Sequence, residues 1–234
     1  MTIDEIRLQL RKRANPTIAA HSLRFFKTGP GEYGEGDRFL GIRVPVLRKL
    51  ARQCSGESLK EVENLLQSPW HEERLFALLR LVRRFETGPE AERRQIYNLY
   101  LDNTRFINNW DLVDSSAHRI LGPWLMERDR GLLHRLAGSD NLWERRIAVM
   151  ATLHFIRHRQ FDDTLKIACQ LLDDTEDLIH KAVGWMLREI GKREQTVSEA
   201  FLHRHYRQMP RTMLRYAIER FPEPLRKQYL KGLV

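Results

Sequence analysis

Apolar residues recur at helical spacing along almost the whole sequence, and this periodicity limits the possible folds more than any other feature. No segment shows the sustained alternation of apolar and polar residues that is typical of a half-buried β-strand. Prolines interrupt the helical pattern at positions that suit the first turn of a helix, namely Pro16, Pro45, Pro69, Pro89, Pro210 and Pro222. The sequence therefore predicts an all-α protein of about a dozen short helices.

Four of the five tryptophans suggest an internal repeat. Trp70, Trp110, Trp143 and Trp185 are spaced by 40, 33 and 42 residues, and each begins or lies within an amphipathic segment. Such a period is typical of HEAT or armadillo helical hairpins, which stack into a curved solenoid with a concave binding face. We expect a single HEAT-like α-solenoid domain over residues 1–234 with a concave basic face. An irregular helical bundle is the alternative.

The segment 28–39 is the exception to the helical pattern, because it contains four glycines and a proline. A phosphate-binding loop would need GxxxxGK[ST], or a strand before GxGxxG, and neither context is present. We expect this segment to be a mobile connector between the second and third helices.

Length and composition define the broad class of the protein. A chain of 234 residues buries a sizeable core without disulfides, and its two cysteines, Cys54 and Cys169, are too few for a disulfide framework or a zinc site of paired cysteines. No apolar run approaches the roughly 20 residues that span a bilayer, and the N-terminus lacks the apolar core of a signal peptide. We expect a cytoplasmic monomer that binds no membrane, no metal and no cofactor.

The charge balance points to an anionic partner. The formal net charge is +9, and the basic residues are 31 arginines and 9 lysines. The planar guanidinium of arginine forms paired hydrogen bonds to phosphate and stacks on aromatic rings. These properties favour nucleic acid over a merely solvated basic surface, although only modestly.

The segment KAVGWMLREI (181–190) places a tryptophan among cations. On a helical wheel one face carries Val183, Met186, Leu187 and Ile190, and the opposite face carries Lys181, Gly184, Trp185 and Arg188. A surface that contacts phosphate and sugar would explain this second face. The alternative is packing against a neighbouring repeat, with Arg188 paired to an acid.

The segment DNLWERRIAVMATLHFI (140–156) reads as one largely buried helix that contains Trp143 and Arg146. A buried guanidinium requires an anion, because an unpaired buried charge is very costly. A carboxylate from an adjacent helix or a DNA phosphate would serve. The sequence alone favours the carboxylate.

The segment NNWDLVDSS (108–116) contains the best candidate for a catalytic acid. Asn108 or Asn109 suits the helix cap and Asp111 suits the first turn, but Asp114 has neither role. Asp114 follows Trp110 by one helical turn, at the edge of an apolar face, so its carboxylate should project beside the indole. Such a pair could stabilise an oxocarbenium-like sugar and orient a water molecule. A salt bridge to one of the arginines is the alternative.

Other candidate sites for metal binding or catalysis have weaker support in the sequence. The pairs His154 with His158 and His203 with His205 lack the further ligand that a metal site needs. The serines lack the nucleophile-elbow context of the hydrolases.

From its first helix to about residue 220, the chain resembles the HEAT-like repeat alkylpurine DNA glycosylases, the AlkD family of DNA alkylation repair enzymes. The segments that carry the resemblance are LGIRVPVLRKLA (40–51), WDLVDS (110–115), SDNLWERRIA (139–148) and KAVGWMLRE (181–189). Two departures are the pair Phe25 and Phe26, where relatives have a hydroxyl-bearing aromatic residue, and the glycine-rich segment, which resembles an insertion.

The resemblance implies a reaction and a set of site residues. Trp110, Trp185 and Asp114 would contact the deoxyribose of the damaged nucleotide, and Asp114 would stabilise the sugar cation and position water. Arg146 and Arg188 would hold phosphates, and Lys181 and Trp143 complete the expected DNA-binding set. The implied reaction is hydrolysis of the N-glycosidic bond of N3- or N7-alkylated purines in duplex DNA, without base flipping, which would associate the protein with the nucleoid.

Two other classes of function compete with a glycosylase. One is a non-catalytic protein that recognises damaged or distorted duplex DNA by shape and phosphate contacts. The other is a HEAT-like scaffold whose basic face binds an acidic protein. The combination of Trp110, Asp114 and Trp185 favours the glycosylase.

Overall fold

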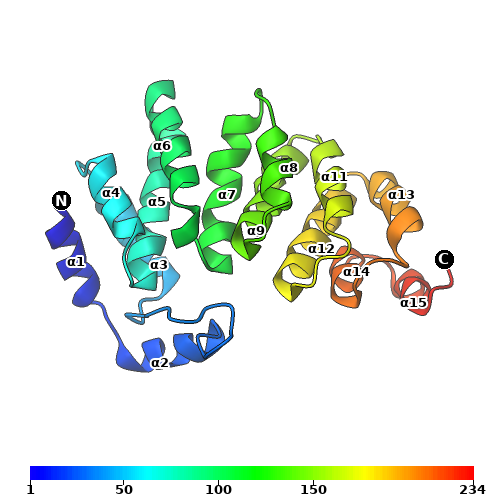
Figure 1. Ribbon diagram of the computed structural model, residues 1–234, viewed down its shortest axis with the longest axis horizontal. Helices are drawn as coiled ribbons and strands as arrows, with labels where there is room; N and C mark the ends of the chain where they lie inside the picture. Colours follow the sequence, from blue (N-terminus) through cyan, green and yellow to red (C-terminus); the bar gives the residue numbers. More distant parts are fainter. The chain divides into compact units, whose positions relative to one another are not determined.

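The computed structural model describes residues 1–234 and consists of helices joined by loops, with a long connection between the second and third helices (Figure 1). It contains fifteen α-helices, one short 3-10 helix and no β-strand, so the predicted all-α class is confirmed. No helix is both long and apolar enough to cross a membrane. The chain divides into two compact units, Met1–Ser116 and Ala117–Val234. The single domain over residues 1–234 stays a prediction.

The first unit contains six complete helices, the 3-10 helix and the start of a seventh α-helix. These are α1 (Ile3–Arg11), α2 (Pro16–Phe25), α3 (Val44–Gln53), α4 (Leu59–Leu66), α5 (His71–Thr87), α6 (Glu90–Asp102), η1 (Thr104–Phe106) and α7 (Trp110–Leu125), which continues into the second unit. Helix α5 packs against α3, α4 and α6 and is buried almost all round. By contrast, α2 has no fully buried residue.

The second unit holds the remaining helices. These are α8 (Gly131–Ala137), α9 (Leu142–Ala151), α10 (Leu153–Arg157), α11 (Asp162–Gln170), α12 (Asp177–Gly191), α13 (Gln195–His205), α14 (Arg211–Ala217) and α15 (Glu223–Lys231). Helix α12 packs against α9, α13 and α14, and α8 packs against α9 and α11. Neighbouring helices thus bury one another's apolar faces within each unit, as predicted from the helical periodicity.

Helix boundaries follow local signals with some informative differences. Pro16 begins α2 and Pro45 lies in the first turn of α3, as predicted, whereas Pro89, Pro210 and Pro222 occupy the N-cap position just before their helices. Pro69 instead precedes the capping residue of α5, outside the helix. The predicted continuous helix over 140–156 is interrupted, because the hydroxyl of Thr152 donates to the carbonyl of Val149 at 2.7 Å and the chain restarts as α10.

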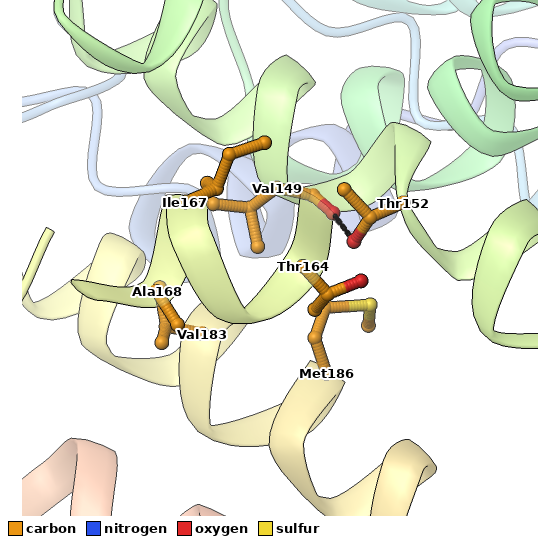
Figure 2. A pocket seen from close by; sticks show the side chains of 7 residues that line it. All are labelled: Val149, Thr152, Thr164, Ile167, Ala168, Val183 and Met186. Carbon is orange, nitrogen blue, oxygen red and sulfur yellow. Dashed lines mark hydrogen bonds between the residues drawn. The ribbon is translucent and has the colours of Figure 1, made fainter. Parts of the chain in front are cut away.

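The core of the second unit contains a cluster of mostly apolar side chains from α9, the residue after it, α11 and α12 (Figure 2). They are Val149, Thr152, Thr164, Ile167, Ala168, Val183 and Met186, and they leave no room between them for a water molecule. Thr164 is 3% exposed and its hydroxyl has no hydrogen-bond partner, whereas the Thr152 hydroxyl donates to Val149. The same cluster therefore holds one satisfied and one unsatisfied hydroxyl.

We expect Thr164→Val to stabilise the protein. A buried polar group without a partner costs about 1–3 kcal/mol, and valine has nearly the same shape without the hydroxyl. Thermal unfolding should shift upward by roughly 2–4 °C for each kcal/mol gained. Thr152→Val is the matched control and should lower the melting temperature, because it removes a hydrogen bond that is made. A lower melting temperature for Thr164→Val would contradict this assignment.

Candidate functional site

A pocket of about 360 Å³ opens in the first unit between α2, α3, α5 and the start of α7. Its walls are largely apolar and aromatic, with residues that include Phe25, Phe26, Val44, Leu75 and Trp110. Two carboxylates on α7, Asp111 and Asp114, also line it, and Arg48 is its only arginine. An apolar pocket with a few polar groups is the usual form of a ligand site.

The start of α7 places Trp110 and Asp114 as predicted. The side-chain oxygen of Asn109 accepts a hydrogen bond from the Trp110 backbone N–H at 2.9 Å. Val113 is fully buried, whereas Trp110 and Asp114 are half-buried and line the pocket one helical turn apart. The local prediction for this segment is therefore confirmed, while the catalytic role of its residues stays a prediction.

Aromatic rings hold the Trp110 indole in place. Its ring stacks on Phe26, with centroids 5.3 Å apart and planes inclined by 22°. Phe25 meets the same indole edge to face at 5.9 Å and is 56% exposed. The two phenylalanines that replace the expected hydroxyl-bearing aromatic thus form one wall of the pocket around Trp110.

A buried ionic bridge that no sequence pattern predicted lies beside the pocket. His71, at the start of α5, contacts Asp37 through Nδ1 and Asp111 through Nε2, each at 2.8 Å. Arg74 also donates to Asp37 at 2.8 Å. Burial would lower the pKa of His71, but the Asp111 and Asp37 carboxylates raise it to about 9. The ring is therefore an imidazolium near neutral pH and donates from both nitrogens.

The glycine-rich segment 28–39 differs from the expected mobile connector. It forms a series of turns whose end is buried, because Asp37 bonds to His71 and Arg74 and Phe39 stacks on His71 at 4.5 Å. Burial would raise the pKa of Asp37, but these two cationic side chains lower it. The end of the segment is thus anchored beside the pocket.

The LGI motif that follows is held by a buried carboxylate. Glu72 accepts the backbone N–H groups of Leu40, Gly41 and Ile42 at 2.8, 2.7 and 3.1 Å. Gly41 has a φ of +79°, and a Cβ there would lie 2.1 Å from the Asn15 carbonyl oxygen. No side chain fits at this position, so the motif requires glycine.

The second unit contains Trp185, Lys181 and Arg188, which lie along α12. Trp185 is half-buried and its indole N–H donates to Glu189 at 3.3 Å. Arg188 pairs with Glu219, and Lys181 pairs with Asp177 at 2.7 Å. An acid thus partners Arg188, as in the alternative considered for this face.

Gly184 shows that part of this face packs against a neighbouring helix, as in the alternative considered for it. The residue is buried against α14, where a Cβ would lie 2.4 Å from the Met213 carbonyl oxygen. Glycine here permits the close approach of α12 and α14, so this part of the face packs within the unit.

Trp143 and Arg146 lie on α9 and are both buried, with 8% and 4% exposure. The Arg146 guanidinium donates to the main-chain carbonyl of Leu178, in the first turn of α12. The structure therefore gives Arg146 a hydrogen-bonding role between two helices. Its expected contact with a phosphate stays a prediction.

A family model described as "DNA alkylation repair enzyme" matches residues 6–221. The chain belongs to this family. The family name indicates a role in the repair of alkylation damage and DNA as the substrate, which is what the resemblance of its four motifs led us to expect. A search of the curated proteins found no match.

Several solved structures share the fold of this chain. A predicted DNA alkylation repair enzyme from Enterococcus faecalis is 21% identical, with 90% of this chain and 98% of that chain covered and a TM-score of 0.67. AlkD2 from Streptococcus mutans is 16% identical, with 95% and 100% covered and a TM-score of 0.52. The smu.31 protein from Streptococcus mutans UA159 is 17% identical, with 77% and 93% covered and a TM-score of 0.53. At these identities the likeness concerns the fold alone.

Proposed function

We propose that this DNA alkylation repair protein is a monofunctional glycosylase that hydrolyses the N-glycosidic bond of cationic N3- or N7-alkylpurines in duplex DNA without base flipping. The bond between the sugar C1′ and the purine nitrogen breaks, and its electron pair leaves with the base. Because the alkylated purine carries a positive charge, it departs as a neutral molecule and needs no general acid. Water then adds to C1′ and loses a proton, which produces an abasic site.

The observation that carries the proposal is the juxtaposition of Trp110 and Asp114 in one pocket. Positive charge develops on the sugar as the bond breaks, and a carboxylate beside an aromatic face stabilises such a charge. Asp114 lines this pocket one helical turn after Trp110, so its carboxylate and the indole border the same space. We therefore assign to Asp114 the stabilisation of the sugar cation and the orientation of the attacking water.

The resemblance to the AlkD family suggests roles for residues of the second unit. Trp185 is proposed to contact the deoxyribose, and Arg188, Lys181, Arg146 and Trp143 are proposed to hold the DNA. Trp185 is half-buried on α12, in the same helix as the two cations Lys181 and Arg188. This arrangement supports a surface for sugar and phosphate.

A single-turnover assay with the purified protein tests the function. Duplex DNA methylated at N7 of guanine is incubated with excess protein, and the released base is separated and quantified against spontaneous depurination. Release well above the spontaneous rate, with none from an unmethylated duplex, is the expected result. Binding of methylated duplex without base release would replace this proposal with the non-catalytic DNA-binding alternative. Absence of DNA binding would leave the HEAT-like scaffold that binds an acidic protein as the remaining alternative.

We expect Arg188→Ala to weaken binding to damaged and undamaged duplex alike, because phosphate contacts position DNA without reading its sequence. The slope of log affinity against log salt should fall by about 0.9 for one lost contact. Glu219→Gln, which removes the carboxylate partner of Arg188, is the matched control and should not weaken binding. Unchanged affinity of Arg188→Ala, measured by fluorescence anisotropy, would contradict the phosphate contact.

Measurements of DNA binding and of melting temperature together separate the two roles of Arg146. A phosphate contact requires weaker binding by folded Arg146→Ala, whereas its hydrogen bond to the Leu178 carbonyl requires a lower melting temperature.

A further inference from the structure

The bridge from Asp37 through His71 to Asp111 joins three segments that are distant in the sequence. Asp37 lies near the end of the glycine-rich segment, His71 begins α5, and Asp111 lies in the first turn of α7. Both contacts of the imidazole ring are 2.8 Å long, and the side chains of His71 and Asp37 are each 2% exposed. The position of the first turn of α7 is therefore tied to a single buried ring.

A second route connects the same ring to Trp110. His71 stacks on Phe39 with centroids 4.5 Å apart, Phe39 stacks on Phe26 at 5.0 Å, and Phe26 stacks on Trp110 at 5.3 Å. His71 also contacts Phe26 directly at 5.0 Å. The indole is thus held through stacked rings, and its neighbour Asp111 is held through a charged hydrogen bond.

We propose that His71 is a positioning residue for the candidate site, and that its imidazolium, by donating to both Asp37 and Asp111, holds Trp110 and Asp114 in the geometry that base excision uses. This inference rests on the proposed glycosylase function. His71 does not line the pocket. It acts through the first turn of α7 and through the aromatic stack.

The charges around the ring determine its response to pH. Asp37 and Arg38 lie on the preceding segment, Arg74 on α5, Arg48 on α3, and Asp111 and Asp114 on α7. Two carboxylates in direct contact keep the ring protonated near neutral pH. A neutral imidazole has one N–H, so loss of the proton leaves one of the two carboxylates facing a ring nitrogen that no longer donates.

Excision should consequently fall as pH rises through the pKa of His71, about 9. Asp111→Asn sharpens this expectation, because the amide oxygen still accepts from the ring but the negative charge that raises the pKa is gone. In that variant the alkaline fall should move to lower pH by about one unit or more. Asp102→Asn, at an exposed position at the end of α6, is the control and should keep the wild-type profile.

His71→Phe separates the two routes, because it keeps a ring for the stack and removes both donors. We expect excision per folded molecule to fall by about tenfold or more, with the alkaline limb abolished. Single-turnover release of N7-methylguanine is measured from pH 6.5 to 10, corrected at each pH for the reaction without protein. A wild-type rate in His71→Phe, or a wild-type profile in Asp111→Asn, would overturn the positioning role.

A spectroscopic titration tests the inference without a measurement of catalysis. It also applies if His71→Phe does not fold. The ring ¹⁵N resonances of His71 in the DNA-free protein report its protonation, and the difference in emission between wild type and Trp110→Phe reports the indole. The ¹⁵N resonances and the indole emission should change over the same alkaline pH range. In Asp111→Asn both should change at lower pH. An indole emission that stays constant while His71 loses its proton would overturn the inference. Joint titration without base release at any pH would instead support the coupling and refute the glycosylase function.

Discussion

Replacement of Asp114 by asparagine is expected to lower single-turnover release of N7-methylguanine by on the order of 10²-fold or more. Asparagine has nearly the same shape, so the pocket and its aromatic wall should persist. It lacks the negative charge that would stabilise the sugar cation and that would accept a proton from the attacking water. Affinity for methylated duplex should change little, because Asp114 lies in a pocket and is not a proposed phosphate contact.

The melting temperature and the duplex affinity of Asp114→Asn distinguish catalysis from structure. A structural Asp114 would show reduced stability with normal excision per folded molecule. Asp111→Asn is an informative comparison, because it removes the other carboxylate of the pocket. This variant is expected to shift the pH profile of excision without the same loss of excision activity at neutral pH. Equal losses in both variants at pH 7 would show that the negative charge of the pocket matters more than the position of either carboxylate.

Local pattern was sufficient to predict the all-α class and the helical site segment on α7. Helical periodicity, prolines in first turns and an asparagine cap act within a few residues, so the sequence displays them directly. The apolar face that includes Val113, Ala117 and Ile120 is fully buried, and Asp114 borders it beside the pocket. Asp114 therefore stood out as an acid with neither a capping nor a first-turn role.

Contacts between distant segments could not be predicted in the same way. His71 lies 34 residues from Asp37 and 40 from Asp111, and no periodicity connects the three. In the sequence, His71 reads as one more polar residue at the start of a helix. Only the fold shows that Asp37, near the end of the glycine-rich segment, supplies one of the two carboxylates that contact His71.

The helical wheel of α12 shows a related limit. It separated an apolar face from a face with Trp185 and Arg188, but it could not reveal that Gly184 packs against α14 or that Arg188 pairs with Glu219. Both contacts come from α14 and the turn after it. A wheel assigns faces to a helix, whereas its neighbours decide which part of each face is covered.

Replacement of Glu72 by glutamine is expected to destabilise the first unit strongly, even though the side chain keeps its size. Glu72 is 3% exposed, and its two oxygens accept three backbone N–H groups from residues 40–42. Glutamine places an amide NH₂ where one oxygen stood, so a buried donor faces another donor. Loss of a charged hydrogen bond together with an unsatisfied N–H costs about 3–5 kcal/mol, which should lower the melting temperature by roughly 10 °C.

The exposed acid Asp102 provides the control, since Asp102→Asn makes the same chemical change without burial and should leave the melting temperature almost unchanged. Asp37 lies three residues before Leu40, so release of the LGI motif should also loosen the bridge to His71. Folded Glu72→Gln is therefore expected to lose excision activity in addition to stability. A melting temperature within about 2 °C of wild type would show that the three N–H groups find other acceptors and that Glu72 does not hold the motif.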